Sequence, residues 1–170
     1  MSELAAIEDS SWENQTVKDN TKLLMACFLE TLRLRPPAPG HAPDVVAVDG
    51  VVIDGKTVPV GTTVYAFFSA YYRNEECFDN PTAFDPYRWI DGRVETAAAK
   101  HNMPMSEFFA PFLFAHHVCL GKMLAEIEAM VVTSKLLRRF SFTLVGDTPK
   151  SKMAIAVGIN KLTVIAKANK

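Results

Sequence analysis

The sequence lacks an excess of charge of either sign, because 18 Lys and Arg residues stand against 19 Asp and Glu residues for a net charge of −1. Nucleic acids and anionic membrane surfaces select strongly basic proteins, so we expect neither as a partner. Cysteine is also scarce, with three residues spaced widely along the chain. An odd and scattered set is not a disulfide framework, and the expected location is therefore the reducing cytoplasm.

Long apolar runs are absent as well. No window approaches the roughly 18–20 apolar residues of a membrane-spanning helix, so we expect no membrane anchor in this chain. Residues 1–15 are polar and acidic, without the basic-then-apolar order of a signal peptide. We expect them to form a flexible N-terminal segment, followed by one domain over residues 16–170.

The residues that are present form segments of two different periods. Asn20 to Leu34 has helical spacing and is ended by Pro36 and Pro37, whereas 38–66 holds short Val- and Ile-rich runs separated by the hairpin signal Asp-Gly. This order predicts an α+β fold with helices beside small antiparallel sheets. We further expect a short helix over 66–72, an irregular segment over 73–89, a polar surface insertion over 90–108, a helix from Cys119 to about Arg138, and two or three strands over 140–170.

Cys119 is the most informative single residue. It follows a short aromatic loop and directly precedes a segment of helical spacing, in which one face is expected to be buried: Leu120, Met123, Leu124, Ile127, Met130 and Val131. The N-terminus of a helix presents unpaired N–H groups and the positive end of the helix dipole, and both favour thiolate over thiol. Thiolate is the form that binds metal, so this placement suits a haem-thiolate site.

The loop from Phe112 to Gly121 resembles the haem-binding loop of the cytochrome P-450 family, whose pattern is Phe-x-x-Gly-x-Arg-x-Cys-x-Gly. Phe112, Cys119 and Gly121 match this pattern. Glu30 and Arg33 lie three residues apart on the first helix and resemble the Glu-x-x-Arg of the same family. Arg88 stands where a downstream arginine completes that pair. These ordered motifs extend the resemblance from about Asn20 to Ile165.

The resemblance implies the C-terminal part of the cytochrome P-450 fold for residues 16–170. It assigns Cys119 as the axial ligand of haem iron, Phe112, His117 and Gly121 as cofactor-binding positions, and Glu30, Arg33 and Arg88 as a buried structural ion network. The helix that forms the distal wall of the haem pocket in this family would precede residue 1. We therefore expect a truncated member of the family.

Two departures from the family pattern concern the haem propionates. His117 replaces the arginine two residues before the cysteine, and Asp44 precedes Val45-Val46 where an arginine is common. A charge-assisted hydrogen bond is worth roughly 1.5–3 kcal/mol, so losing two would weaken haem retention by several powers of ten. We therefore expect haem b to bind weakly through Cys119. Leu113 and Ala115 are also larger than the small residues typical of this loop.

Three functions remain open on this sequence. The first is a truncated P-450-like protein of a specialised-metabolite pathway, with weak or no independent haem monooxygenase activity. The second is a cofactor-free cyclase or isomerase, such as a pericyclase, acting on an apolar terpene- or polyketide-like substrate in the former haem cavity. Its candidate catalytic residues are His41, Asp44, His116 and His117. The third is a non-catalytic partner of a full-length relative, or a homodimer, that covers an exposed apolar face.

Overall fold

The computed structural model describes residues 21–38, 40, 44–46, 50–147, 151–153, 157–159 and 162–169, with only the backbone at 44–45, 151–153 and 157–159. The expected flexible segment 1–15 lies outside the described residues. In this part of the chain, helices pack beside four two-stranded antiparallel sheets, which confirms the α+β class. Among the described helices, none combines the length and the apolar composition needed to cross a membrane.

Helix α3 (Lys22–Leu34) confirms the first expected helix. It starts at Thr21, and Pro36 and Pro37 follow its end because proline disfavours helical backbone in the residue before it. One face of the helix is buried and carries both apolar and charged side chains: Ala26, Glu30, Leu32 and Arg33. A helix that buries two charges must neutralise them within the fold, and the site below shows how.

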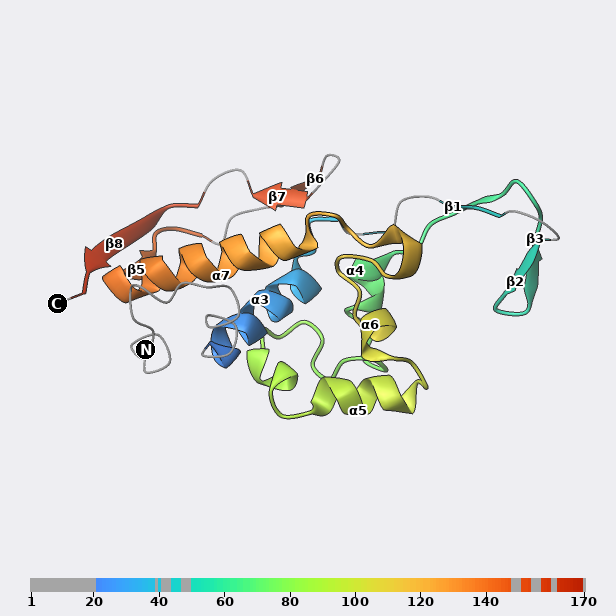
Figure 1. The fold of residues 1–170 in the computed structure, drawn as a ribbon, viewed down its shortest axis with the longest axis horizontal. Coiled ribbons are helices and arrows are strands. Elements are labelled where there is room, and N and C mark those ends of the chain that lie inside the picture. The colour runs from blue at the N-terminus through green and yellow to red at the C-terminus, as the bar shows by residue number, and fades with distance from the viewer. Residues whose placement is uncertain are drawn as a thin grey trace.

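Strands β1 (Asp44–Val45) and β4 (Thr63–Val64) pair antiparallel, and so do β2 (Val51–Ile53) and β3 (Lys56–Val58). Asp54 and Gly55 connect β2 to β3, with φ values of 48° and 71°. Two successive residues with positive φ are typical of the tight turn that Asp-Gly favours, so the hairpin prediction is confirmed. The hairpin projects from one end of the molecule, away from the helices (Figure 1).

The main core forms around α4 (Phe68–Tyr71), the 3-10 turn η1 (Pro86–Trp89), α5 (Arg93–Lys100) and α6 (Met105–Phe108). Aromatic rings fill it, with centroids 4.4 Å apart for Trp89 and Phe109 and 5.0 Å apart for Tyr72 and Phe109. The segment 90–108 is therefore not the polar surface insertion that we expected. Val94 and Ala98 lie one helical turn apart on α5 and are buried, since a short helix needs only one narrow apolar stripe to join a core.

After the turn η2 (Ala115–His117), helix α7 (Lys122–Arg139) runs beside α3 (Figure 1). The helix is confirmed, but its expected buried face is wrong for the first two turns. Met130 is buried, whereas Leu120 is fully exposed and Met123 and Leu124 are 68% and 60% exposed. Helical spacing fixes which residues share a face, and a second element in contact decides whether that face is buried.

Beyond α7 the chain forms β5 (Phe140–Leu144), β6 (Ser151–Met153), β7 (Val157–Ile159) and β8 (Val164–Ala168). Strand β5 pairs with β8 from Phe140↔Ala168 to Leu144↔Val164, and β6 pairs with β7. The antiparallel arrangement is as predicted. The described part holds four strands here instead of the expected two or three, because β6 and β7 are too short to stand out as separate runs in the sequence.

Candidate functional site

The candidate site is the loop between α6 and α7, which closes on itself around Cys119. The Cys119 amide donates a hydrogen bond to the Phe112 carbonyl at 2.8 Å, and the Lys122 amide donates to the Cys119 carbonyl at 3.2 Å. Helix α7 begins at Lys122, three residues later than the helix that we expected from Cys119. The thiol is unpaired with other cysteines and exposed to solvent. The fold therefore presents one accessible sulfur at the N-terminal end of an 18-residue helix.

Two non-glycine residues of this loop have left-handed backbone. Leu113 has a φ of 63° and Ala115 a φ of 51°. A side chain in this region crowds the backbone at a cost of about 1–2 kcal/mol per residue. The loop thus keeps at Ala115 a conformation that suits the glycine of the family pattern. Gly121 is different, because its φ is −82° and an added Cβ would meet the Cys119 Sγ at an ordinary 3.7 Å.

A cavity of about 440 Å³ lies against Cys119. Its walls come from α3, α4, the loop and α7, and they include Phe28, Leu32, Phe68, Phe112, Leu113 and Ala125. Among the described residues that line it, the Cys119 thiol is the one side chain with a heteroatom. The cavity therefore offers a flat or aromatic ligand apolar contact and one soft donor atom.

A second cavity, of about 580 Å³, also borders the loop, at Phe114, Ala115 and His117. It too is mainly apolar, and His117, Glu107 and Tyr71 are the ionisable residues in its described lining. Of the four candidate catalytic residues, His117 alone is placed in the described lining of either cavity, and His116 lines neither. His41 lies outside the described residues, and Asp44 is described only as a backbone position in β1.

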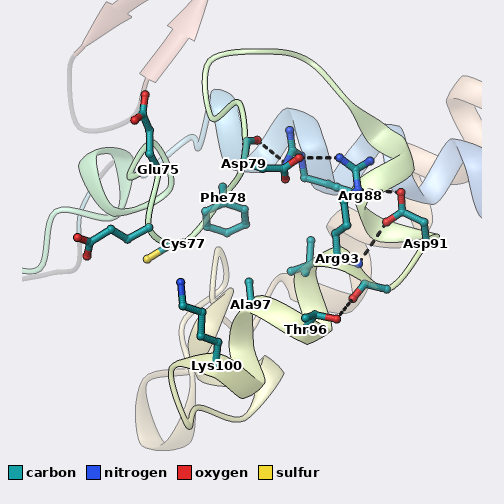
Figure 2. A pocket seen from close by; sticks show the side chains of 13 residues that line it. Glu75, Cys77, Phe78, Asp79, Arg88, Asp91, Arg93, Thr96, Ala97 and Lys100 are labelled. Carbon is teal, nitrogen blue, oxygen red and sulfur yellow. Dashed lines mark hydrogen bonds and ion pairs between the residues drawn. The ribbon is translucent and has the colours of Figure 1, made fainter.

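A third cavity, of about 420 Å³, lies beside α5 and is lined by many charged side chains (Figure 2). Four of these charged residues, Asp79, Arg88, Asp91 and Arg93, form ion pairs with one another. Arg93 contacts Asp79 at 2.9 Å, Asp85 at 2.7 Å and Asp91 at 2.8 Å. The arginine therefore ties the loop after α4 to η1 and α5. We interpret this cavity as part of the structural support and assign it no chemistry.

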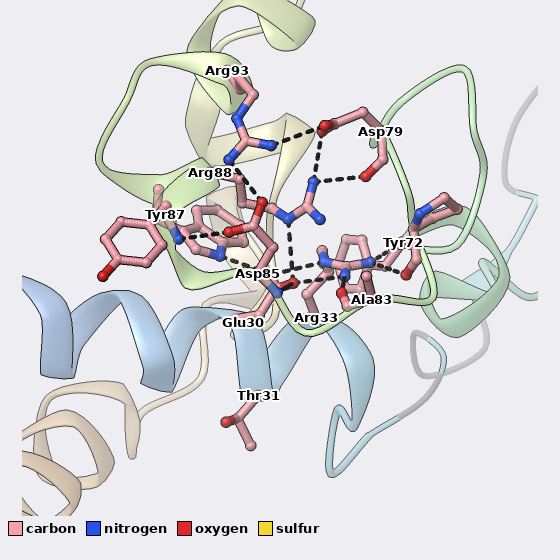
Figure 3. Close-up of polar contacts among 12 residues, drawn as sticks. Glu30, Thr31, Arg33, Tyr72, Asp79, Ala83, Asp85, Tyr87, Arg88 and Arg93 are labelled. Atoms are coloured by element: carbon pink, nitrogen blue, oxygen red, sulfur yellow. Dashed lines mark hydrogen bonds and ion pairs between the residues drawn. The ribbon is translucent and has the colours of Figure 1, made fainter.

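Glu30, Arg33 and Arg88 meet in the buried ion network that the resemblance implies (Figure 3). Arg33 donates from Nε and Nη2 to the two carboxylate oxygens of Glu30, at 2.9 and 2.8 Å. Arg88 Nε donates to Glu30 Oε1 at 3.2 Å. The side chains are at most 1% exposed. The three residues named from the sequence are thus brought together.

The network also contains partners that the sequence motifs do not reveal. The Asp85 amide and the Trp89 indole each donate to Glu30 at 2.9 Å. Burial raises the pKa of Glu30, but hydrogen bonds from Arg33, Asp85 and Trp89, with the positive charge of Arg33, hold that pKa below its ordinary value. Arg88 also donates to Asp79 at 2.7 Å. Spacing in the sequence gives no signal for a carboxylate whose partner is an indole or a backbone amide.

Arg33 further anchors the segment that leads from α4 to η1. Its Nη1 donates to the Tyr72 and Pro81 carbonyls at 2.7 and 2.6 Å, and its Nη2 donates to the Ala83 carbonyl at 3.0 Å. The Tyr72 hydroxyl in turn accepts a hydrogen bond from the Ala110 amide at 3.1 Å, just before the cysteine loop. The network therefore positions the chain on which Cys119 is carried.

The residues around Cys119 suit a haem in two respects and do not suit it in a third. A single accessible thiol ahead of a helix and an apolar wall suit an axial ligand and a porphyrin face. In the described part of the chain, no group of three or more His, Cys, Asp or Glu side chains is placed to share a metal ion. The departure is the cavity rim, where the described lining includes no cationic side chain for the propionates.

Comparison with known proteins agrees with this geometry. The sequence model of the family described as Cytochrome P450 matches residues 5–166. The chain is 37% identical to cytochrome P450 monooxygenase macH of Penicillium terrestre, over 74% of this chain and 24% of that protein. It is also 37% identical to the steroid 17-alpha-hydroxylase/17,20 lyase of Squalus acanthias, over 73% of this chain and 23% of that protein. The chain thus spans about a quarter of the length of these curated relatives.

Among solved structures, the fold matches a zebrafish cytochrome P450 in a structure with abiraterone. The TM-score is 0.77 at 25% sequence identity, and the match covers 99% of this chain and 38% of that one. The described helices and small sheets are therefore arranged as in part of that larger protein.

Proposed function

The chain belongs to the cytochrome P450 family, and from this premise we propose that it forms the thiolate-bearing part of a haem-thiolate site, with weak or no monooxygenase activity by itself. The observation that carries the proposal is the exposed Cys119 thiol at the wall of an apolar cavity, directly ahead of α7. Haem, when bound, would supply the redox chemistry at its iron. The relatives are monooxygenases, and a specialised-metabolite pathway remains our expectation for this chain.

The chain's own residues would bind and orient such a group. Cys119 would bind the haem iron, held in place by the hydrogen bond from its amide to the Phe112 carbonyl. Phe112 and Ala125 would give the group apolar contact, since both line the cavity.

Three features support weak activity. Ala115 and His117 replace the glycine and the arginine of the family loop, and the left-handed φ of Ala115 strains that loop. Cys119 is exposed to solvent, and O–O chemistry at a haem depends on a shaped distal pocket. The match covers 38% of the zebrafish P450 chain, so most of that fold has no counterpart in these 170 residues.

The exposed apolar face of α7 supports a partner as part of this proposal. Leu120, Met123 and Leu124 form an uncovered row beside the cysteine loop. Exposed apolar patches on stable proteins mark interaction surfaces. We therefore propose that another P450-type polypeptide, or a second copy of this chain, covers the row and completes the site.

A redox-neutral cyclase is the second candidate, and the 580 Å³ cavity favours it. His117 and Glu107 line this mainly apolar cavity together with Tyr71, which is the arrangement that a proton-transfer site for an apolar substrate needs. In this reading the two side chains would hold or move a proton, and Cys119 would have no role. Turnover of apolar candidate substrates that is lost in His117→Ala and kept in Cys119→Ser would favour this candidate.

The haem proposal is tested by titrating haem b into the purified chain and recording absorption spectra of the oxidised form and of the reduced form under carbon monoxide. We expect a thiolate-type shifted Soret band that Cys119→Ser abolishes and Cys27→Ser leaves in place. Cys27 is the matched control because it lies on α3 and outside the described lining of the cavity. A folded sample without specific binding would refute Cys119 as an iron ligand.

A further inference from the structure

We infer that the Cys119 cavity selects uncharged ligands, and that it binds a porphyrin with neutral side groups in preference to haem b with its two propionates. This inference deepens the function proposed above and rests on it in one respect, the assignment of this cavity as the porphyrin site. It concerns the charge of the ligand and not the identity of the iron ligand.

The lining of the cavity is the first observation. The described residues around it come from five separate segments, and each contributes carbon surface: Phe28 and Leu32 from α3, Pro37 and Gly40 after it, Phe68 from α4, Phe112 from the loop, and Ala125 from α7. The Cys119 sulfur is the one polar side-chain atom among them. A ligand that enters meets apolar contact on every described wall.

Lys122, three residues after Cys119, lines a different cavity. Three other basic residues on neighbouring segments are occupied elsewhere. Arg33 is buried and donates to Glu30 and to three carbonyl groups. Arg73 donates to Ser69 and to the Leu34 carbonyl. His117 lines the second cavity. The two arginines have partners of their own, so recruiting either for an anion would break contacts that hold the fold.

Charge selection follows from this arrangement. A carboxylate that leaves water without a cation or a hydrogen-bond donor loses its hydration without compensation, whereas an ester loses far less. A cationic partner would reverse that balance through a charge-assisted hydrogen bond. Because the described lining supplies no such partner, removing the charge of the ligand should strengthen binding.

The test compares haem b with its dimethyl ester, in which both propionates are neutral. Each is titrated into the 170-residue chain, and binding is followed by Soret absorbance and by quenching of tryptophan fluorescence. We expect the ester to bind at least about tenfold more tightly, the equivalent of roughly 1.4 kcal/mol. Ligand solubility and non-specific partitioning differ between the two compounds, so the decisive quantity is how a variant changes their affinity ratio.

Ala38→Arg supplies the missing cation. Ala38 lines the cavity and is exposed, so a long side chain has room at the rim. We expect this variant to tighten haem b at least about tenfold and to leave the ester unchanged. Thr57→Arg is the matched control, because it adds the same charge on the exposed, projecting β3 strand. It should leave the affinity ratio at its original value.

The outcomes separate this inference from the proposed function. Haem b binding as tightly as the ester, with a ratio unchanged by Ala38→Arg, would overturn the charge selection. Binding of neither compound to folded protein would overturn both ideas. A preference for the ester that survives Cys119→Ser, with a spectrum that Cys119→Ser does not alter, would support charge selection and refute Cys119 as the ligand.

Discussion

Replacing Glu30 by Gln is the substitution for which the structure predicts the largest loss of stability. Glu30 accepts five hydrogen bonds through its two carboxylate oxygens, from Arg33 twice and from Arg88, Asp85 and Trp89 once each. The glutamine is nearly the same size but directs an NH2 group at donors. It also removes the negative charge that neutralises two arginines that are at most 1% exposed.

Breaking a buried ion pair by removing one partner costs about 3–5 kcal/mol, because the remaining charge stays uncompensated. We expect a loss of that size in the free energy of unfolding of Glu30→Gln, measured by urea denaturation with tryptophan fluorescence. Glu128→Gln makes the same change at an exposed position of α7 and should cost less than about 0.5 kcal/mol.

The pH dependence gives an independent check of the same residue. The pKa of Glu30 is below its ordinary value of 4.5, so its contribution to stability is complete above that value. The contribution is lost as the pH falls through the lowered pKa of the folded state. The native chain should therefore lose stability below about pH 4.5, and Glu30→Gln should lose less over the same range. A cost below about 1 kcal/mol, with an unchanged pH profile, would refute the account of the network.

Three further predictions concern the loop, the core and the α7 face. Ala115→Gly should stabilise the chain by about 0.5–1 kcal/mol in urea denaturation, because it removes a side chain at a φ of 51°. The control Ala99→Gly, at an exposed position of α5, should cost about 1 kcal/mol. A loss of stability in Ala115→Gly would contradict the strain assigned to the loop. Tyr72→Phe leaves the buried Ala110 amide without its 3.1 Å acceptor and should lower the melting temperature by about 2–10 °C, and an unchanged value would show that this hydrogen bond is dispensable. Leu124→Glu should abolish self-association, or binding to a P450-type partner, in sedimentation experiments. Val132→Glu, further along α7, should leave that association intact. Equal behaviour of the two variants would locate the interface elsewhere.

The sequence predicts those parts of the fold whose determinants are local. Proline after α3 and Asp-Gly between β2 and β3 act through backbone geometry, and both gave the observed boundaries. Glu30 and Arg33 share a helix face by spacing alone. Their connection to Arg88 came from the family resemblance, since 55 residues separate Arg33 from Arg88 and no periodicity spans that distance.

Tertiary contacts explain what the sequence does not predict. The polar composition of 90–108 gave no sign that Val94 and Ala98 are buried, because two small residues are enough to pack α5 against the core. The row from Leu120 to Leu124 has the spacing of a buried face and is exposed, because burial requires a neighbour that spacing does not report. His116 and His117 are neighbours in the sequence and were both candidate catalytic residues. Of the two, His117 alone lines a cavity described here, because adjacent residues point in different directions.

The most direct test of the central claim is resonance Raman spectroscopy of the ferric haem complex, prepared with natural cysteine and with cysteine labelled with sulfur-34. If Cys119 is the axial ligand, an iron–sulfur stretching band shifts to lower frequency on labelling and disappears in Cys119→Ser. A folded, haem-bound sample with no isotope-sensitive band, or one whose band persists in Cys119→Ser, would contradict the assignment of Cys119 as the iron ligand.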